Sequence, residues 1–171
     1  MLVEKSPPNL LKLRFLQKLF PDATFVVIMR HPIAVSYATQ KWSETSLESL
    51  LEHWLVCHET FLEDAPHIRK LVLVRYEDFV GDPAGVVGRI QERLGLAPSE
   101  AAFKARTGIN DDYFKRWKAR LKPRQKRKHA ELAGRFEERT NRFGYSLVEP
   151  ERDAEPASEI AELLGRLAPA R

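Results

Sequence analysis

Apolar residues recur every three or four positions in several stretches of the chain, and this spacing predicts amphipathic helices. The first helix is predicted from Asn9, whose side chain can cap its start, to Phe20, where Pro21 ends it. The clearest helix covers residues 47–61. Further helices are predicted to begin at Pro32 and to cover residues 83–94, 125–142 and 158–167.

Two short apolar runs, residues 24–29 and 71–76, predict β-strands. Neither run alternates between apolar and polar positions, and the first is rich in β-branched residues. We therefore expect each strand to be buried on both faces, as in a parallel sheet. The order strand, helix, helix, strand, helix predicts an α/β domain with right-handed crossovers.

Composition fits this class of fold. The chain has 171 residues, of which 43% are hydrophobic and 30% charged, which is enough for one domain with its own core. No apolar run approaches the roughly 20 residues of a membrane helix, and the first residues carry no signal-peptide stretch. Together with the single cysteine, Cys57, this favours a cytoplasmic protein without a membrane partner.

The chain changes character towards its end. Residues 149–156 are acidic and contain prolines, so we expect residues 1–148 to form the domain and residues 149–171 to form a linker with a short helix. The net charge of +4 suits an anionic ligand and is too small to argue for nucleic acid.

Chemistry is first indicated where the first strand ends, because Arg30 follows it directly and a helix begins at Pro32. Ligands of open α/β sheets bind at the carboxyl ends of the strands. A helix start presents free N–H groups and a partial positive charge, and a guanidinium matches a phosphate. Ser36, about one turn into the helix, can donate its hydroxyl. The alternative is that Arg30 caps the sheet edge and Ser36 lies on the helix surface.

Three blocks of sequence resemble the sulfotransferases that use 3′-phosphoadenosine-5′-phosphosulfate (PAPS). The blocks are EKSP at 4–7 with LFPDATFVVIMRHP at 19–32 and VS at 35–36, then LVRYEDF at 73–79 with DP at 82–83, and then YFKRWK at 113–118 with FGY at 143–145. The likeness is greatest to bacterial members and the tyrosylprotein branch. The blocks occur in the family's order, which makes them more specific together than each is alone.

The resemblance implies contacts to the phosphates of PAPS. Arg30 and Ser36 match the residues that contact the 3′-phosphate. Thr39 is a substitute for the hydroxyl, because the interval from Arg30 to Ser36 is shorter than in cytosolic members. Lys5 matches a catalytic lysine that stabilises charge on the departing nucleotide; without the resemblance, a solvated lysine is the better interpretation.

The resemblance also implies contacts to the rest of the nucleotide. Tyr76 matches a tyrosine whose ring lies against the adenine, although an aromatic residue at an apolar position is more often a core residue. Trp117 and Lys118 fall in the segment that closes over the nucleotide.

The fold implied by the resemblance is a three-layer parallel sheet flanked by helices, of the P-loop nucleotide-hydrolase type. The family's phosphate-binding loop has no counterpart, because no G-x-x-x-x-G-K pattern occurs. We therefore expect an N-terminally truncated, partial enzyme. A missing central strand leaves an open apolar edge, so we expect the chain to be poorly stable or to pair with a complementing N-terminal polypeptide or a second copy.

The expected function is transfer of a sulfuryl group from PAPS to a hydroxyl or amine of a small-molecule or protein acceptor. A different class of function is suggested by the basic segment, residues 115–128, which could bind polyanions or nucleic acid; such a run is usually a solvated face. A third hypothesis, suggested by the missing loop, is that the chain is a decayed gene fragment without function.

Two other groups of polar residues give no site. His53 and His58 are five positions apart, not the four that align ligands on a helix, so no metal is predicted. Glu77 and Asp78 are adjacent and would point to opposite faces of an extended chain, which argues against a shared catalytic site.

Overall fold

Two short strands at the centre of the fold pair in parallel, as predicted. β1 (Phe25–Met29) lies beside β2 (Leu71–Arg75), with Phe25 opposite Leu71 and Met29 opposite Arg75. The structure is a computed structural model that describes residues 3–98, 105–119 and 123–167. Within these residues the sheet has two strands.

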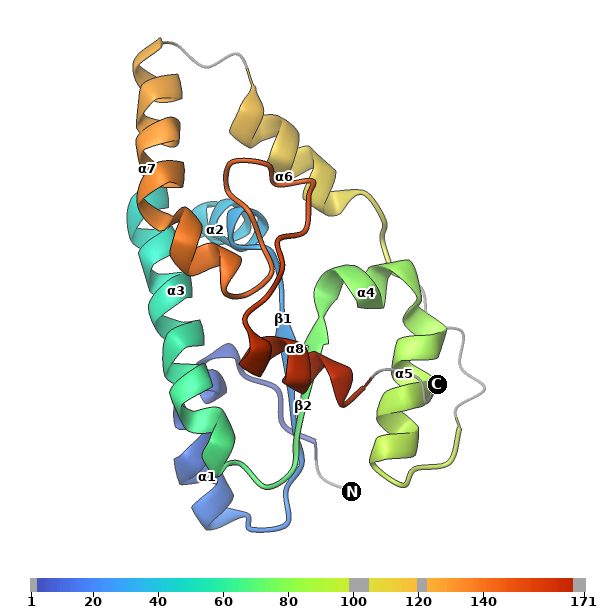
Figure 1. Cartoon of the computed structure of the whole chain (residues 1–171). Coiled ribbons are helices and arrows are strands. Elements are labelled where there is room, and N and C mark those ends of the chain that lie inside the picture. Colours follow the sequence, from blue (N-terminus) through green and yellow to red (C-terminus); the bar gives the residue numbers. More distant parts are fainter. Residues whose placement is uncertain (1–2, 99–104, 120–122, 168–171) are drawn as a thin grey trace.

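Helices make up most of the other described residues (Figure 1). In chain order they are η1 (Pro7–Lys12), α1 (Leu13–Leu19), α2 (Pro32–Gln40), α3 (Leu47–Asp64), η2 (Ala65–His67), α4 (Tyr76–Gly81), α5 (Pro83–Arg93), α6 (Ile109–Lys118), α7 (Pro123–Asn141) and α8 (Ser158–Gly165).

The first predicted helix is divided in two. Residues 7–12 form a 3-10 helix, and the α-helix begins only at Leu13. Pro7 and Pro8 have no N–H to donate, and a 3-10 turn from the amide of Asn9 to the carbonyl of Ser6 replaces the predicted cap. The prediction that Asn9 caps this helix was therefore wrong.

The main core lies against one face of the sheet. Val27 and Met29 of β1 and Leu71 and Leu73 of β2 point into it. They meet buried residues of the helices α1, α2, α3, α6, α7 and α8, among them Leu13, Ile33, Leu51, Leu55, Phe61, Phe114, Phe136 and Ile160. The alternation of side chains along each strand thus gives this core one apolar stripe from each strand.

The opposite face of the sheet is covered only in part. Val72 and Val74 of β2 pack with Val86 of α5 in a second, smaller core. Their partners in the register, Val26 and Ile28 of β1, are 40% and 60% exposed. The prediction that both strands are buried on both faces holds for β2 and is wrong for β1. The three-layer sheet is not confirmed, because helices cover both faces of β2 but only one face of β1.

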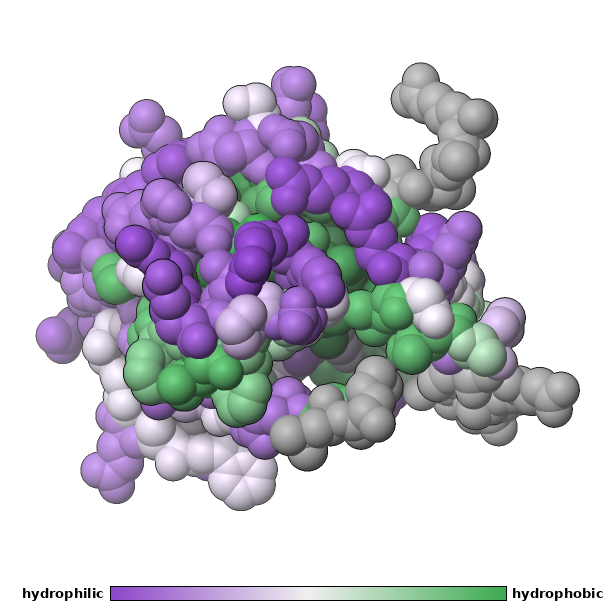
Figure 2. Space-filling model, turned by 90° about the horizontal axis from the view of Figure 1, so that it is seen from below, coloured by the Kyte–Doolittle hydropathy of each residue, from purple (hydrophilic) through white to green (hydrophobic). Residues whose placement is uncertain are grey.

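Apolar side chains are also exposed on α1, at the amino-terminal end of β1. Phe15 and Leu19 of α1, and Phe20 directly after it, are each more than half exposed. Figure 2, which views the molecule from this end, shows green apolar residues open at the surface. The surface around α1 and β1 is therefore more apolar than that of α7, whose outer residues are mostly charged.

The segment after α7 returns to the strand ends through a glycine turn. Gly144 has a φ of +82°, in the left-handed region that favours glycine. Its carbonyl accepts from the amide of Ala154 at 3.2 Å. The turn brings Tyr145 into the core, where it is 1% exposed.

Candidate functional site

The carboxyl ends of β1 and β2 place four polar or aromatic residues side by side. Because Met29 is opposite Arg75 in the register, Arg30 and His31 follow one strand where Tyr76 and Glu77 follow the other. Carboxyl ends of parallel strands meet at one edge of the sheet, and this edge is where ligands of such sheets bind.

Arg30 is held on one face and along one edge. Its guanidinium carbon lies 4.3 Å from the centre of the Tyr76 ring, which is a cation–π contact. Its Nε and Nη2 donate to Oδ1 of Asn110 at 2.9 and 2.8 Å. The structure gives Nη1 no hydrogen-bond partner among the described residues. Of the predicted site residues, Arg30 and Tyr76 are thus brought together.

Glu77 joins the elements around Arg30. Its Oε1 accepts from the amide of His31 at 3.1 Å and from Nδ2 of Asn110 at 2.7 Å, and its Oε2 accepts from the Tyr145 hydroxyl at 2.9 Å. Glu77 and Asp78 were predicted to lie on an extended chain, but α4 begins at Tyr76, so both lie on a helix. The sequence could have pointed to Glu77, because it follows a strand end next to Arg30.

The start of α2 is already capped by the chain itself. Nδ1 of His31 accepts from the amide of Ile33 at 3.2 Å, so Nε2 carries the proton and donates to the carbonyl of Ser146 at 3.1 Å. Burial lowers the pKa of His31 to about 3, so the ring is neutral at pH 7. The expectation that this helix start presents free N–H groups to an anion is therefore wrong for its first amide.

Ser36 lies inside the fold rather than on the helix surface. It is 2% exposed, and its hydroxyl has no hydrogen-bond partner among the described residues. A buried hydroxyl without a partner is unusual, since most such groups are hydrogen-bonded. Thr39, its predicted substitute, is exposed on the next turn of α2.

The other predicted site residues do not meet Arg30. Lys5 is exposed and has no hydrogen bond or ion pair with a described residue. Lys118 pairs with Glu151. Trp117 is 6% exposed, its Nε1 donates to the carbonyl of Leu147 at 2.9 Å and its ring stacks on His129. This placement makes Trp117 a core residue, whereas the resemblance puts it in the segment that closes over the nucleotide.

An array of tyrosines and cations, which sequence reasoning missed, lies between α2 and α6. The rings of Tyr37 and Tyr113 are nearly parallel, with centres 6.2 Å apart. Arg116 lies 4.5 Å from the Tyr37 ring, and the Lys41 ammonium donates to the Tyr113 hydroxyl at 3.2 Å. Arg30 approaches the same Tyr113 ring at 5.8 Å, so this array continues the site along α6.

The basic segment 115–128 is partly neutralised by the chain itself. Lys118 pairs with Glu151, and Arg127 pairs with Glu131 one turn away on α7. Residues 120–122 of this segment lie outside the described residues. These pairs favour the interpretation of the segment as a solvated face.

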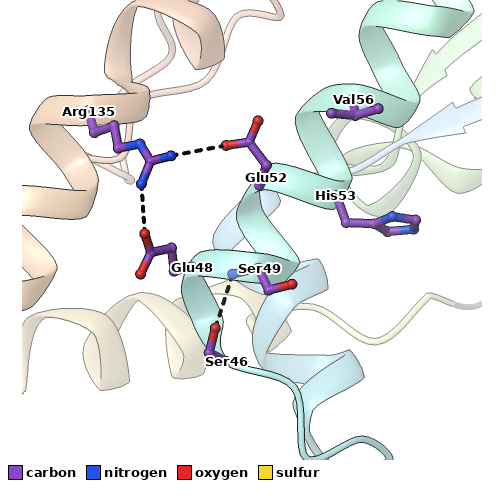
Figure 3. Close-up of a pocket in the computed structure, with 7 residues that line it drawn as sticks. All are labelled: Ser46, Glu48, Ser49, Glu52, His53, Val56 and Arg135. Carbon is purple, nitrogen blue, oxygen red and sulfur yellow. Dashed lines mark hydrogen bonds and ion pairs between the residues drawn. The ribbon is translucent and has the colours of Figure 1, made fainter.

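A shallow hollow between α3 and α7 is not part of this site (Figure 3). Its lining includes Arg135, which forms ion pairs with Glu48 at 2.7 Å and Glu52 at 3.9 Å. In Figure 3, His53 points away from these ion pairs. The hollow is open to solvent, and the ion pairs of Arg135 with Glu48 and Glu52 join α7 to α3.

The described part of the chain contains no group of three or more His, Cys, Asp or Glu side chains arranged to hold a metal ion. None of its helices has the length and apolar character needed to cross a membrane.

Comparison with known proteins shows the family of this chain through a family model. A search of curated proteins found no match to this chain. The sequence model of the family described as "Sulfotransferase family" matches residues 1–100, which include β1, β2, Arg30 and Glu77. The match covers more than half of the chain, so the chain belongs to the sulfotransferase family.

Proposed function

We propose that this chain binds PAPS and serves the transfer of its sulfuryl group to a hydroxyl or amine acceptor. The observation that carries the proposal is the position of Arg30 at the tip of β1, with its guanidinium over Tyr76 and Nη1 without a partner among the described residues. Family membership supports sulfuryl transfer in general. The donor and the class of acceptor are our inference.

The residues at the strand ends fit the 3′-phosphate and the base of PAPS in part. A guanidinium with an open edge suits a phosphate. The hydroxyl of Ser36, which has no partner among the described residues, is enclosed by the fold, so it can contact a phosphate only if the residues around it move. The half-buried ring of Tyr76 suits an adenine. The capped start of α2 does not fit, so side chains rather than the first helix amide must supply the contacts.

Of the two predicted lysines, Lys5 is available to the ligand and Lys118 is held in an ion pair. PAPS supplies the sulfuryl group, and the protein has to stabilise the charge that grows on the leaving oxygen. Lys5 is exposed and forms no ion pair with a described residue, so its ammonium is available for that task. Lys118 would first have to leave Glu151.

Nucleotide titration tests the proposal. Calorimetric titration with adenosine 3′,5′-bisphosphate is expected to show binding by the wild type and about 10- to 100-fold weaker binding by Arg30→Ala, since a charge-assisted contact is lost. Arg14→Ala is the control, because this exposed arginine of α1 forms one ion pair among the described residues, with Asp64 of α3 at 3.8 Å.

A second ligand makes the test specific for the 3′-phosphate. Adenosine 5′-monophosphate lacks that group, so Arg30→Ala and the wild type are expected to bind it alike. Equal affinity of both proteins for the bisphosphate would remove Arg30 from the site. Absence of any binding by the folded wild type would contradict the proposed donor.

A further inference from the structure

Asn110 connects Glu77 to Arg30 across the candidate site. It comes from the first turn of α6, 80 positions after Arg30 and 33 after Glu77. Its Oδ1 accepts from Nε and Nη2 of Arg30, and its Nδ2 donates to Oε1 of Glu77 at 2.7 Å. Both ends of the amide are therefore used, each by a different partner.

The carboxylate of Glu77 fixes which way the amide of Asn110 points. An ionised carboxylate only accepts hydrogen bonds, and a guanidinium only donates them. The NH2 group of Asn110 must therefore face Glu77, and its oxygen must face Arg30. Glu77 is itself held by the amide of His31 and the hydroxyl of Tyr145, so the chain of contacts begins at a fixed point.

The contact with Asn110 also fixes which edge of Arg30 stays open. One oxygen accepts from Nε and Nη2, so it occupies the side edge of the guanidinium. The Tyr76 ring covers one face at 4.3 Å. Rotation of the side chain is thereby restrained from two directions, and Nη1 is the group presented away from Asn110.

We propose that Asn110 is a positioning residue that orients Arg30 for an anionic group of the ligand, and that Glu77 sets the orientation of Asn110. The inference rests on the proposed function, which assigns that group as the 3′-phosphate. A neutral amide suits this task because it accepts from the guanidinium without neutralising its charge. A carboxylate at this position would pair with Arg30 and compete with the ligand.

Two substitutions at position 110 separate this role from a structural one. Asn110→Ala is expected to weaken binding of adenosine 3′,5′-bisphosphate about tenfold, because Arg30 loses its orientation. Asn110→Asp is expected to weaken binding of the bisphosphate about a hundredfold, because the new carboxylate pairs with the guanidinium of Arg30 and competes with the ligand. Neither substitution should change the affinity for adenosine 5′-monophosphate. Asp111 is an exposed neighbour of Asn110 on α6, so Asp111→Ala should leave the affinities for both nucleotides unchanged.

A measurement without ligand tests the contact itself. In nuclear magnetic resonance spectra of the 15N-labelled chain, the Nε–H signal of Arg30, assigned with Arg30→Lys, should exchange slowly with water. Asn110→Ala should make it exchange rapidly or broaden it beyond detection, and Asp111→Ala should leave it unchanged. A signal that is as protected in Asn110→Ala as in the wild type would overturn the inference.

The two experiments distinguish failure of this inference from failure of the proposed function. Two outcomes would overturn the positioning role alone. One is that a substitution at position 110 lowers the affinity for both nucleotides equally. The other is that Asn110→Asp binds the bisphosphate as tightly as the wild type does. A wild type that does not discriminate between the two nucleotides would overturn the proposed 3′-phosphate site, and the assignment of Asn110 to it. The protection of the Arg30 signal would then still decide whether Asn110 holds the guanidinium.

Discussion

Trp117 is fixed at both the edge and the face of its indole. Its Nε1–H donates to the carbonyl of Leu147, and its ring stacks on His129 with centres 4.3 Å apart and planes 13° apart. A smaller side chain here would leave a cavity and a buried carbonyl without a donor. The residue therefore belongs to the packing of α6 against α7 and the segment that follows.

Substitution at Trp117 tests this placement. Trp117→Ala is expected to lower the free energy of unfolding by about 3–5 kcal/mol, and Trp117→Phe by about 1–2 kcal/mol through the lost hydrogen bond. Urea unfolding followed by circular dichroism measures both. Trp42 is 90% exposed, so Trp42→Ala should change stability by less than about 0.5 kcal/mol. Comparable losses at both tryptophans would contradict the core placement.

The site residues differ in how visible they are in the sequence. Arg30 and Tyr76 could be predicted because each follows an apolar strand, and such strands are recognisable locally. Asn110 could not, because its contacts reach across 33 and 80 positions and depend on where α6 packs. The burial of Ser36 was equally hidden, since it depends on the elements packed around α2.

At the scale of elements, β1 differs from β2 in what covers its faces. Ile28 and Val74 are partners in the register and point to the same side of the sheet. Val74 is 3% exposed and packs in the second core, whereas Ile28 is 60% exposed. An open apolar face beside an unpaired strand edge is a surface on which chains associate.

This pair of positions gives a matched prediction. Ile28→Thr is expected to reduce self-association of the chain, measured by sedimentation velocity, and to leave the free energy of unfolding within about 0.5 kcal/mol. Val74→Thr is expected to lower it by about 1–3 kcal/mol, because a hydroxyl enters an apolar core. Equal destabilisation by Ile28→Thr and Val74→Thr would contradict this prediction. It would mean that the outer face of β1 is firmly covered and is not merely a surface for weak association with a second copy.

Elements were predictable where their signal is local. The run 71–76 and the periodicity from Leu47 predicted β2 and α3 nearly to their ends, because the apolar spacing that marks each element lies within the element itself. The open face of β1 was not predictable, because its composition matches that of a buried strand. What covers a strand depends on distant elements, and α5 reaches only β2.

At the scale of the molecule, residues 145–147 tie the strand ends to three helices. Tyr145 donates to Glu77 of α4, the carbonyl of Ser146 accepts from His31 before α2, and the amide of Leu147 donates to Glu137 of α7. These contacts join segments between 10 and 115 positions apart. The candidate site therefore depends on the return of the chain after α7, and its stability follows that of the whole fold.

Two neutral histidines make that stability depend on pH. Burial lowers the pKa of His31 to about 3 and that of His58 to about 4 from the ordinary value of 6.5. Between the folded pKa of each histidine and its ordinary value of 6.5, the unfolded chain binds more protons than the folded chain. Stability is thus fully present above pH 6.5 and falls as the pH drops towards 4 and then 3. Each histidine contributes a slope of up to about 1.4 kcal/mol per pH unit.

Urea unfolding at pH 7.5, 6.0 and 5.0 is expected to show this fall, and His58→Gln is expected to make it shallower by the contribution of one proton. His58 suits the test because Nδ1 donates to the carbonyl of Trp54 at 2.7 Å, a bond that the amide of glutamine can replace without a charge. His67→Gln, at an exposed position, controls for the loss of a histidine as such. A slope that is the same in the wild type and in His58→Gln would show that His58 takes up its proton without unfolding of the chain, and would place the acid sensitivity elsewhere in the fold.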